Sequence, residues 1–202
     1  MKSLVETFLA ASDNECLVKE LMFTGEELAD FSAERFEFEN VSFSKCRFVD
    51  CSFSNASFVH VTMRGCDFSN CHFENSYWRD CNIKGCRANG ASFEYATLRH
   101  SALSDTLFRY ANFNRAFIDR CSIIECDMRE AAFSEVKLVK PQFNTVDFRQ
   151  SDFFKTSLKD IDMSSCLIEG LMVSDQLSEL KGMKISVEQT PYLASYLGVL
   201  IK

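Results

Sequence analysis

Every fifth residue between Phe38 and Val173 is apolar, over 28 consecutive positions and without a change of register. In a chain whose residues are 47% hydrophobic, a run of this length arises by chance about once in 10^9. An α-helix repeats every 3.6 residues and a half-buried strand every two, so neither element produces this pattern. The period of five therefore indicates an internal repeat, which constrains the fold before any single element is assigned.

Each five-residue unit has a second inward position. Two residues before each central apolar residue the chain is mostly small, as at Cys46, Ala56 and Cys66. The other three positions are mainly polar, glycine or charged, which is typical of side chains that face solvent. Because one unit cannot bury its apolar residue alone, the units must stack so that each repeat covers its neighbours.

The units resemble the pentapeptide-repeat family, whose pattern is a small residue, Asp or Asn, Leu or Phe, Ser, Thr or Arg, and a polar residue or glycine. Two close matches are Cys66-Asp67-Phe68-Ser69-Asn70 and Ala111-Asn112-Phe113-Asn114-Arg115. The resemblance implies an all-β fold, a right-handed quadrilateral β-helix in which four units make one coil of twenty residues. At about 4.8 Å per coil, the units from Phe38 to Val173 would build a rod about 34 Å long.

Central phenylalanines of successive coils are expected to stack along the rod, since offset aromatic pairs add to area burial. The predicted core ladder consists of Phe48, Phe68, Phe108 and Phe148. The small central residue Ala88 interrupts this series and predicts a thin place or a bend.

The two ends depart from the repeat, and solenoids need their open ends closed. We expect three parts: an N-terminal cap at 1–22, the β-helix at 23–175, and a C-terminal coil end with a dimerisation helix at 176–202. The cap is helix-compatible, and its predicted apolar face consists of Leu4, Val5, Phe8 and Leu9. Phe31 and Phe36 occupy normally small positions, which predicts irregular packing near that end.

At the other end the register fails after about Asp175. Thr190 and Pro191 are typical of an N-cap and first position of a short helix, and Gly198 is expected to end it. The predicted apolar face of this helix consists of Tyr192, Leu193, Tyr196 and Leu197. Such a face favours a self-complementary homodimer, and the alternative is a lid on a monomer.

The residues give little support for catalysis or for a cofactor. All ten cysteines occupy the small inward position, so we expect free buried thiols rather than disulfides or a zinc site. His60, Asp80 and His100 fall in one column at twenty-residue spacing, which is either a metal or acid–base cluster or, as we favour, a solvated ladder. No phosphate-binding loop or hydrolase motif is present, and a regular rod offers no concave pocket. The sequence therefore predicts a protein that is not an enzyme and holds no metal.

Neither a transmembrane stretch nor a signal peptide is evident, so we expect a cytoplasmic protein. The net charge is −7, and one side of the rod carries most of the imbalance. Only Arg115 and Lys155 oppose the carboxylates of this side, called here the acidic face. The acidic face consists of Glu74, Glu94, Glu135, Asp152 and Asp175.

An acidic face on a rod about as wide as duplex DNA can compete for a basic DNA-binding groove. The alternative is an ordinary solvated surface. Direct nucleic-acid binding is disfavoured, because no basic face neutralises phosphates.

Four segments resemble the Qnr-type, quinolone-resistance branch of the family. They are Phe23-Thr24-Gly25-Glu26, Cys86-Arg87-Ala88-Asn89-Gly90-Ala91-Ser92-Phe93, Gly182-Met183-Lys184-Ile185 and Tyr196-Leu197-Gly198-Val199-Leu200-Ile201. This resemblance implies dimers formed through the C-terminal helix, a DNA-like shape and charge, and protection of DNA gyrase and topoisomerase IV from quinolones. Many proteins of this branch have loops that interrupt the coils. Here the period is intact from Phe93 to Phe113, so we expect no such loop.

Two functions follow as hypotheses. The first is a dimeric DNA mimic that binds a type II topoisomerase. The second is an interaction scaffold for an unrelated protein partner, which would use exposed apolar side chains. The candidates for that role are Tyr95, Tyr110, Phe117, Ile124 and Phe154.

Overall fold

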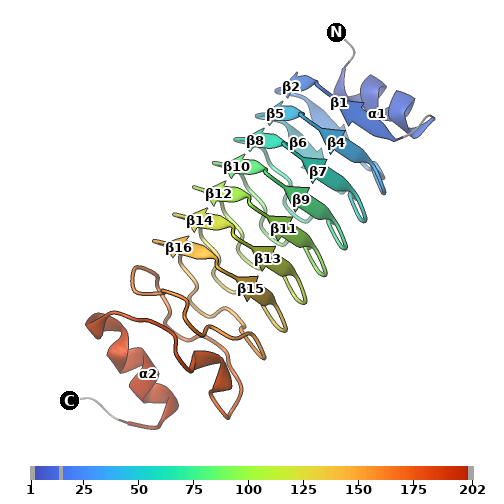
Figure 1. Ribbon diagram of the computed structural model, residues 1–202. Coiled ribbons are helices and arrows are strands. Elements are labelled where there is room, and N and C mark those ends of the chain that lie inside the picture. Colours follow the sequence, from blue (N-terminus) through green and yellow to red (C-terminus); the bar gives the residue numbers. More distant parts are fainter. Residues whose placement is uncertain (1–2, 14–15, 200–202) are drawn as a thin grey trace.

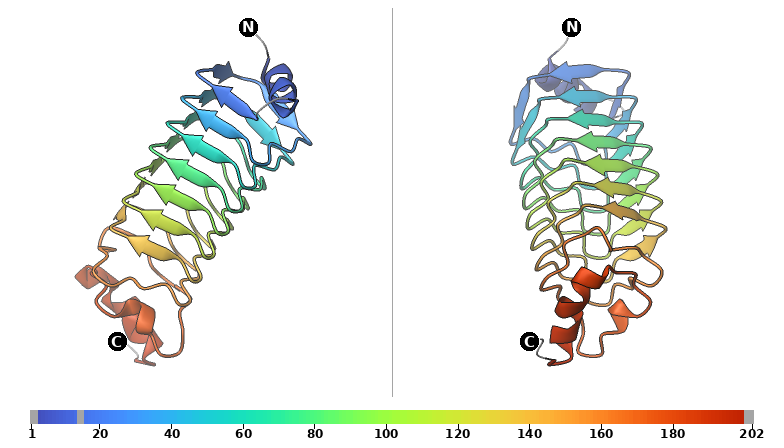
Figure 2. Two further views of the ribbon diagram at one scale, coloured as in Figure 1. Left: turned by 45° about the vertical axis from the view of Figure 1, so that its right-hand side comes forward. Right: turned by 90° about the vertical axis from the view of Figure 1, so that its left-hand side faces the viewer.

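The computed structural model describes residues 3–13 and 16–199 and shows a rod of stacked coils (Figure 1). Two sheets with short parallel strands run along adjacent sides of the rod, as two turned views show (Figure 2). The first sheet contains β1 (Leu17–Lys19), β4 (Glu37–Glu39), β7 (Ser57–Val59), β9 (Tyr77–Arg79), β11 (Thr97–Arg99), β13 (Phe117–Asp119) and β15 (Lys137–Val139). The second contains β2 (Met22–Thr24), β5 (Ser42–Ser44), β8 (Thr62–Arg64), β10 (Asn82–Lys84), β12 (Ala102–Ser104), β14 (Ser122–Ile124) and β16 (Gln142–Asn144).

The remaining two sides of the rod are held mostly by isolated bridges between successive coils. A short sheet of β3 (Glu27–Ala29) and β6 (Arg47–Val49) begins one of these sides. Pairing throughout the strands joins residues twenty apart, as for Phe38 with Phe58. The right-handed quadrilateral β-helix is therefore confirmed, with four five-residue units in each coil.

The last residue of most units has a positive φ, which turns the chain onto the next side of the rod. At residues other than glycine this angle lies between +46° at Lys140 and +63° at Asp160. Asn and Asp tolerate this left-handed conformation and glycine adopts it freely, which explains their frequency at this position. The side chains of these turn residues point outward and form the corners of the rod.

Central residues fill the interior, and one column of rings stacks along almost the whole rod. Its members are Phe53, Phe73, Phe93, Phe113, Phe133 and Phe153, with ring centroids 4.9–5.1 Å apart and planes within 10°. The predicted core ladder is buried too, but its rings pack edge-on against the ring five residues later. These pairs are Phe48–Phe53, Phe68–Phe73, Phe108–Phe113 and Phe148–Phe153, at 5.4–5.7 Å.

The coils continue without a loop through residues 93–113, as the intact period predicts. Phe93 and Phe108 donate backbone hydrogen bonds to Asn112 and Asp127 of the next coil, at 2.6 and 2.7 Å. The backbone N–H of Ala88 likewise donates to Leu107 at 2.7 Å, so this small residue does not break the ladder. The predicted absence of a loop is confirmed.

A helix closes the N-terminal end of the rod. It is α1 (Leu4–Ser12), which begins with a capping box between Ser3 and Glu6. The ring of Phe8 inserts among Phe31, Phe36 and other core rings at 5.5–6.3 Å, which explains why large residues occupy two normally small positions.

Two predictions for this end need correction. Val5 and Leu9 are 41% and 53% exposed, because the buried face of α1 is formed by Leu4, Phe8 and Ala11. The coil geometry also begins before residue 23, since β1 already pairs with β4.

At the C-terminal end the register slips by two residues, as the bridge between Asp162 and Lys184 shows. Two 3-10 helices, η1 (Ser178–Leu180) and η2 (Val187–Gln189), lead to α2 (Thr190–Tyr196). The predicted N-cap Thr190 is wrong: Gln189 is the N-cap, because Thr190 already has helical backbone angles. Gly198, with φ +70°, follows the helix end as expected. Leu200 and Ile201 lie outside the described residues.

Buried polar side chains hold this end to the last coil. Gln189 donates to the backbone carbonyls of Met163 and Cys166, at 2.8 and 2.6 Å. The Glu179 carboxylate is 2% exposed and accepts from the Lys155 N–H and the Ser174 hydroxyl, each at 2.8 Å. These bonds satisfy backbone groups that the end of a solenoid would otherwise leave open.

Candidate partner-binding surface

The predicted acidic face lies on the side of the rod that covers the continuous stack of rings. Glu74 and Glu94 come directly after central phenylalanines, Glu135 is a corner residue, and Asp152 comes directly before Phe153. All four reach solvent, and Asp175 is exposed where the regular coils end. The structure thus places the five carboxylates along one side of the rod.

The protein's own cations neutralise part of this face. Arg115 lies between Glu94 and Glu135, with nitrogen–oxygen distances of 3.1 and 3.4 Å. Lys155 is a further 3.8 Å from Glu135. Counting charges could not reveal this arrangement, in which both cations share the carboxylates nearest to them. The charge available to a partner therefore concentrates on the other three members of the face.

Two of those carboxylates are fixed by hydroxyl groups. Glu74 accepts from Ser54 at 2.8 Å and lies 3.0 Å from the His72 ring. Partial burial opposes its ionisation, but these hydrogen bonds outweigh burial and lower the pKa of Glu74. Asp152 accepts from the Ser134 hydroxyl at 2.7 Å and from the Phe154 N–H at 2.8 Å. These hydrogen bonds hold both side chains in place.

The histidine column forms as the spacing predicts, but as a loose surface ladder. His60 and His100 each place Nδ1 at 4.0 and 3.9 Å from the Asp80 carboxylate between them. All three side chains are 39–53% exposed. Within the described ranges 3–13 and 16–199, no group of three or more His, Cys, Asp or Glu is arranged to hold a metal ion.

Nine of the ten cysteines are buried core residues, and Cys16 is half-buried. Thiols donate to backbone carbonyls, as Cys66 does to Phe43 and Cys81 to Phe58, both at 3.4 Å. Burial raises the pKa of Cys81 to about 11, so this group stays a thiol at neutral pH. The interpretation of the cysteines as small core side chains is confirmed for these nine.

The four apolar residues of α2 do not share one exposed face. Leu193 and Tyr196 are partly buried against the rod, and the Tyr196 hydroxyl donates to the Leu171 carbonyl at 2.6 Å. Tyr192 and Leu197 are 38% and 71% exposed. The predicted arrangement is therefore wrong in part: Leu193 and Tyr196 dock the helix on its own chain, whereas Tyr192 and Leu197 are exposed.

Exposed aromatic side chains lie at two corners of the rod and beside a third. Tyr95, Tyr110 and Phe154 are 51%, 56% and 41% exposed, and each lies beneath a cation within 5.1–5.5 Å of its ring. Ile124 is 37% exposed, and Phe117 is half-buried beneath Arg99 and Lys137. Tyrosine and arginine are enriched in protein-binding hot spots.

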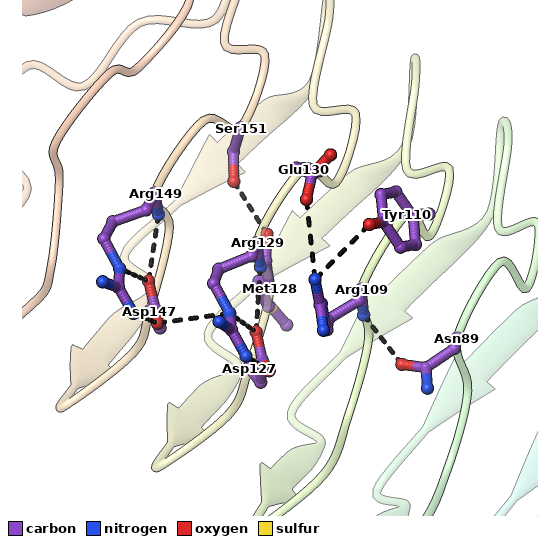
Figure 3. A network of polar contacts seen from close by, with 10 residues as sticks. All are labelled: Asn89, Arg109, Tyr110, Asp127, Met128, Arg129, Glu130, Asp147, Arg149 and Ser151. Atoms are coloured by element: carbon purple, nitrogen blue, oxygen red, sulfur yellow. Dashed lines mark hydrogen bonds and ion pairs between the residues drawn. The ribbon is translucent and has the colours of Figure 1, made fainter.

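A ladder of arginines and aspartates on a third side was not predicted (Figure 3). Arg129 and Arg149 each form two hydrogen bonds to the aspartate two residues earlier, at 2.5–2.9 Å. These bonds outweigh partial burial and lower the pKa of Asp127. The Asp-x-Arg units twenty residues apart are the signal that would have revealed this ladder.

A hollow of about 430 Å³ lies beside the arginine ladder. Its walls include Arg109, Arg129, Arg149, Glu130 and Glu169.

Among the described helices, none has the length and apolar character needed to cross a membrane.

Comparison with known proteins agrees with the repeat and the fold. The family profile described as "Pentapeptide repeat region" matches residues 56–119, and "Pentapeptide repeats (8 copies)" matches 101–138. A trypsin-treated variant of QnrB1, a plasmid-mediated fluoroquinolone resistance protein, is similar over 90% of this chain and 99% of its own, with TM-score 0.51 and 21% identity. HetL, a pentapeptide repeat protein involved in heterocyst differentiation regulation from the cyanobacterium Nostoc sp. strain PCC 7120, is similar over 91% of this chain and 95% of its own, with TM-score 0.44 and 14% identity. No curated protein matches the sequence.

Proposed function

We propose that this chain, a member of the pentapeptide-repeat family, is a non-enzymatic DNA mimic that binds a type II topoisomerase. The enzyme would be DNA gyrase or topoisomerase IV, and binding would modulate it or protect it from quinolones. The observation that supports this proposal is the uninterrupted rod with fixed carboxylates along one side. The fold that the chain shares with the fluoroquinolone resistance protein QnrB1 supports the same choice.

In this proposal the rod occupies the DNA-binding groove of the enzyme, and the acidic face meets the basic residues that otherwise contact phosphates. Glu74 and Asp152 would contribute most, because hydroxyl groups fix them and neither has a Lys or Arg within ion-pair distance in the described structure. Glu94 and Glu135 would contribute less, since Arg115 already neutralises them.

The protein would act in the cytoplasm as a homodimer formed through α2, with Tyr192 and Leu197 at the interface. Both are exposed, and neighbouring Val199 is 52% exposed as well. A dimer would lengthen the rod and present two acidic faces to the enzyme.

A calorimetric titration of gyrase tests the proposed role of the acidic face. The double variant Glu74→Lys and Asp152→Lys is expected to weaken binding at least tenfold, and Glu94→Lys alone is expected to weaken it less. Lys45→Glu, on the opposite side of the rod, is the matched charge-reversal control and should leave affinity within twofold. Equal affinity for the double variant and the control would contradict the proposal.

The second candidate is an interaction scaffold for another protein, favoured by the exposed rings on the surface of the rod. Replacing Tyr95 and Phe154 with serine separates the two functions. If the rings carry recognition, these changes abolish partner binding while the lysine substitutions on the acidic face leave it unchanged.

A further inference from the structure

The arginine ladder has one incomplete member. Arg129 and Arg149 each have an aspartate two residues earlier, and each binds that carboxylate through two nitrogens. Arg109 occupies the same position one coil earlier, but Leu107 stands where the aspartate would be. The missing carboxylate distinguishes Arg109 from Arg129 and Arg149 in the next two coils, which lie to its left in Figure 3.

The contacts of Arg109 do not replace that carboxylate. Its Nη2 atom lies 3.4 Å from the Tyr110 hydroxyl and 3.6 Å from the Glu130 carboxylate. Its Nε atom is buried and has no hydrogen-bond partner among the described residues. A buried N–H without an acceptor is destabilising, and it costs more on a charged group. An acceptor from another molecule would therefore form the hydrogen bond that Nε lacks, and that bond would stabilise the complex.

We propose that Arg109 is the recognition site for an aspartate or glutamate side chain of a partner protein. The Arg109 side chain is 37% exposed although its Nε atom is buried, so a rotation of the guanidinium must bring Nε to the incoming carboxylate. A carboxylate that binds it through two oxygens, as Asp127 binds Arg129, gives Nε its acceptor. The partner's carboxylate thus completes the ladder at the position where this chain has Leu107.

The surroundings of Arg109 favour a protein segment. Leu107 is 39% exposed and Tyr110 is 56% exposed, so an apolar residue next to the acidic one would find a surface to cover. Tyrosine and arginine are, with tryptophan, enriched in protein-binding hot spots. The site therefore fits an acidic residue flanked by an apolar one.

The same surroundings disfavour a nucleic acid. Asp127, Asp147, Glu130 and Glu169 lie along this ladder or the hollow beside it. A strand of phosphates would meet these carboxylates in succession, whereas a single carboxylate at Arg109 meets one unpaired donor. This inference does not depend on the identity of the partner proposed above, because it concerns a different side of the rod.

The test uses the full chain and a phage-displayed library of random seven-residue peptides. The decisive variant is Leu107→Asp, which supplies the missing carboxylate from within and should form the pair seen at Asp127 and Arg129. Arg109→Gln removes the cation. Arg47→Gln, on the same side but paired with Glu27, is the matched control.

We expect the wild type and Arg47→Gln to enrich peptides that contain Asp or Glu, at least fivefold over both Leu107→Asp and Arg109→Gln. An enriched peptide should also shift the Arg109 Nε–H signal in NMR spectra of the wild-type protein. Equal enrichment on Leu107→Asp would overturn the proposal. It would also be overturned if inorganic phosphate shifted that signal as much as the enriched peptide at equal concentration, since the site would then bind any anion.

Discussion

Replacement of Phe93 with leucine tests whether the stack of rings is a main source of stability. The Phe93 ring is buried, and its centroid lies 5.0 and 4.9 Å from the parallel rings of Phe73 and Phe113. Each aromatic pair contributes about 0.5–1.5 kcal/mol beyond area burial, so the loss of both stacked pairs costs about 1–3 kcal/mol. Alanine at this position would add a cavity and raise the cost to about 3–5 kcal/mol.

Ile118→Leu is the matched control, because Ile118 is an equally buried central residue and the change keeps an aliphatic side chain. Its expected cost is below about 1.5 kcal/mol. Guanidinium chloride unfolding is followed by circular dichroism and by the fluorescence of Trp78, the chain's single tryptophan. Coincident transitions would show that the coils unfold together. A cost for Phe93→Leu no larger than that of the control would refute the reasoning.

Three further predictions concern the corners and ends of the rod. Thr145→Gly is expected to stabilise the fold by about 1 kcal/mol in chemical denaturation, because Thr145 is β-branched and has φ +53°. The reverse change, Gly85→Thr at φ +63°, should cost a similar amount, since its added Cβ meets no atom within 4 Å. The pKa of Glu179 is lowered by hydrogen bonds that outweigh burial, so its contribution is present above the unfolded pKa of about 4.3 and is lost as pH falls through the folded pKa. Thermal melts from pH 7 to pH 3 should therefore fall less steeply for Glu179→Ala, which starts from a lower melting temperature, and parallel profiles would contradict this. Leu197→Asp is expected to convert the proposed dimer to a monomer in light scattering, and a dimer of unchanged affinity would exclude this residue from the interface.

The sequence predicts the coils well because every unit repeats the same physical requirement. A central residue such as Phe93 must point inward in each unit, so the period gives the register and the absence of a loop, while the four sides follow from the resemblance to the pentapeptide-repeat family. The ends were predicted less well, because the rotation of a short helix depends on what it covers. The apolar residues Val5 and Leu193 look equivalent in sequence, yet only Leu193 packs on the rod.

The positions of the acidic residues also follow from the spacing, but their electrostatic environment does not. Arg115 is a corner residue with φ +58°, and its side chain reaches Glu94 in the coil before it and Glu135 in the coil after it. The buried Nε of Arg109 likewise depends on side-chain packing that no spacing rule contains. Spacing places residues on a side of the rod, whereas the folded structure determines which charges remain unpaired.

The supercoiling of relaxed plasmid by DNA gyrase, with and without ciprofloxacin, tests the proposed function most directly. Increasing amounts of this protein are expected to restore supercoiling in the drug-treated reaction, or to inhibit the untreated reaction by competition with DNA. The double variant at Glu74 and Asp152 should have a weaker effect at equal concentration. No change in either reaction, at protein concentrations well above that of the enzyme, would contradict the proposed role as a DNA mimic for gyrase.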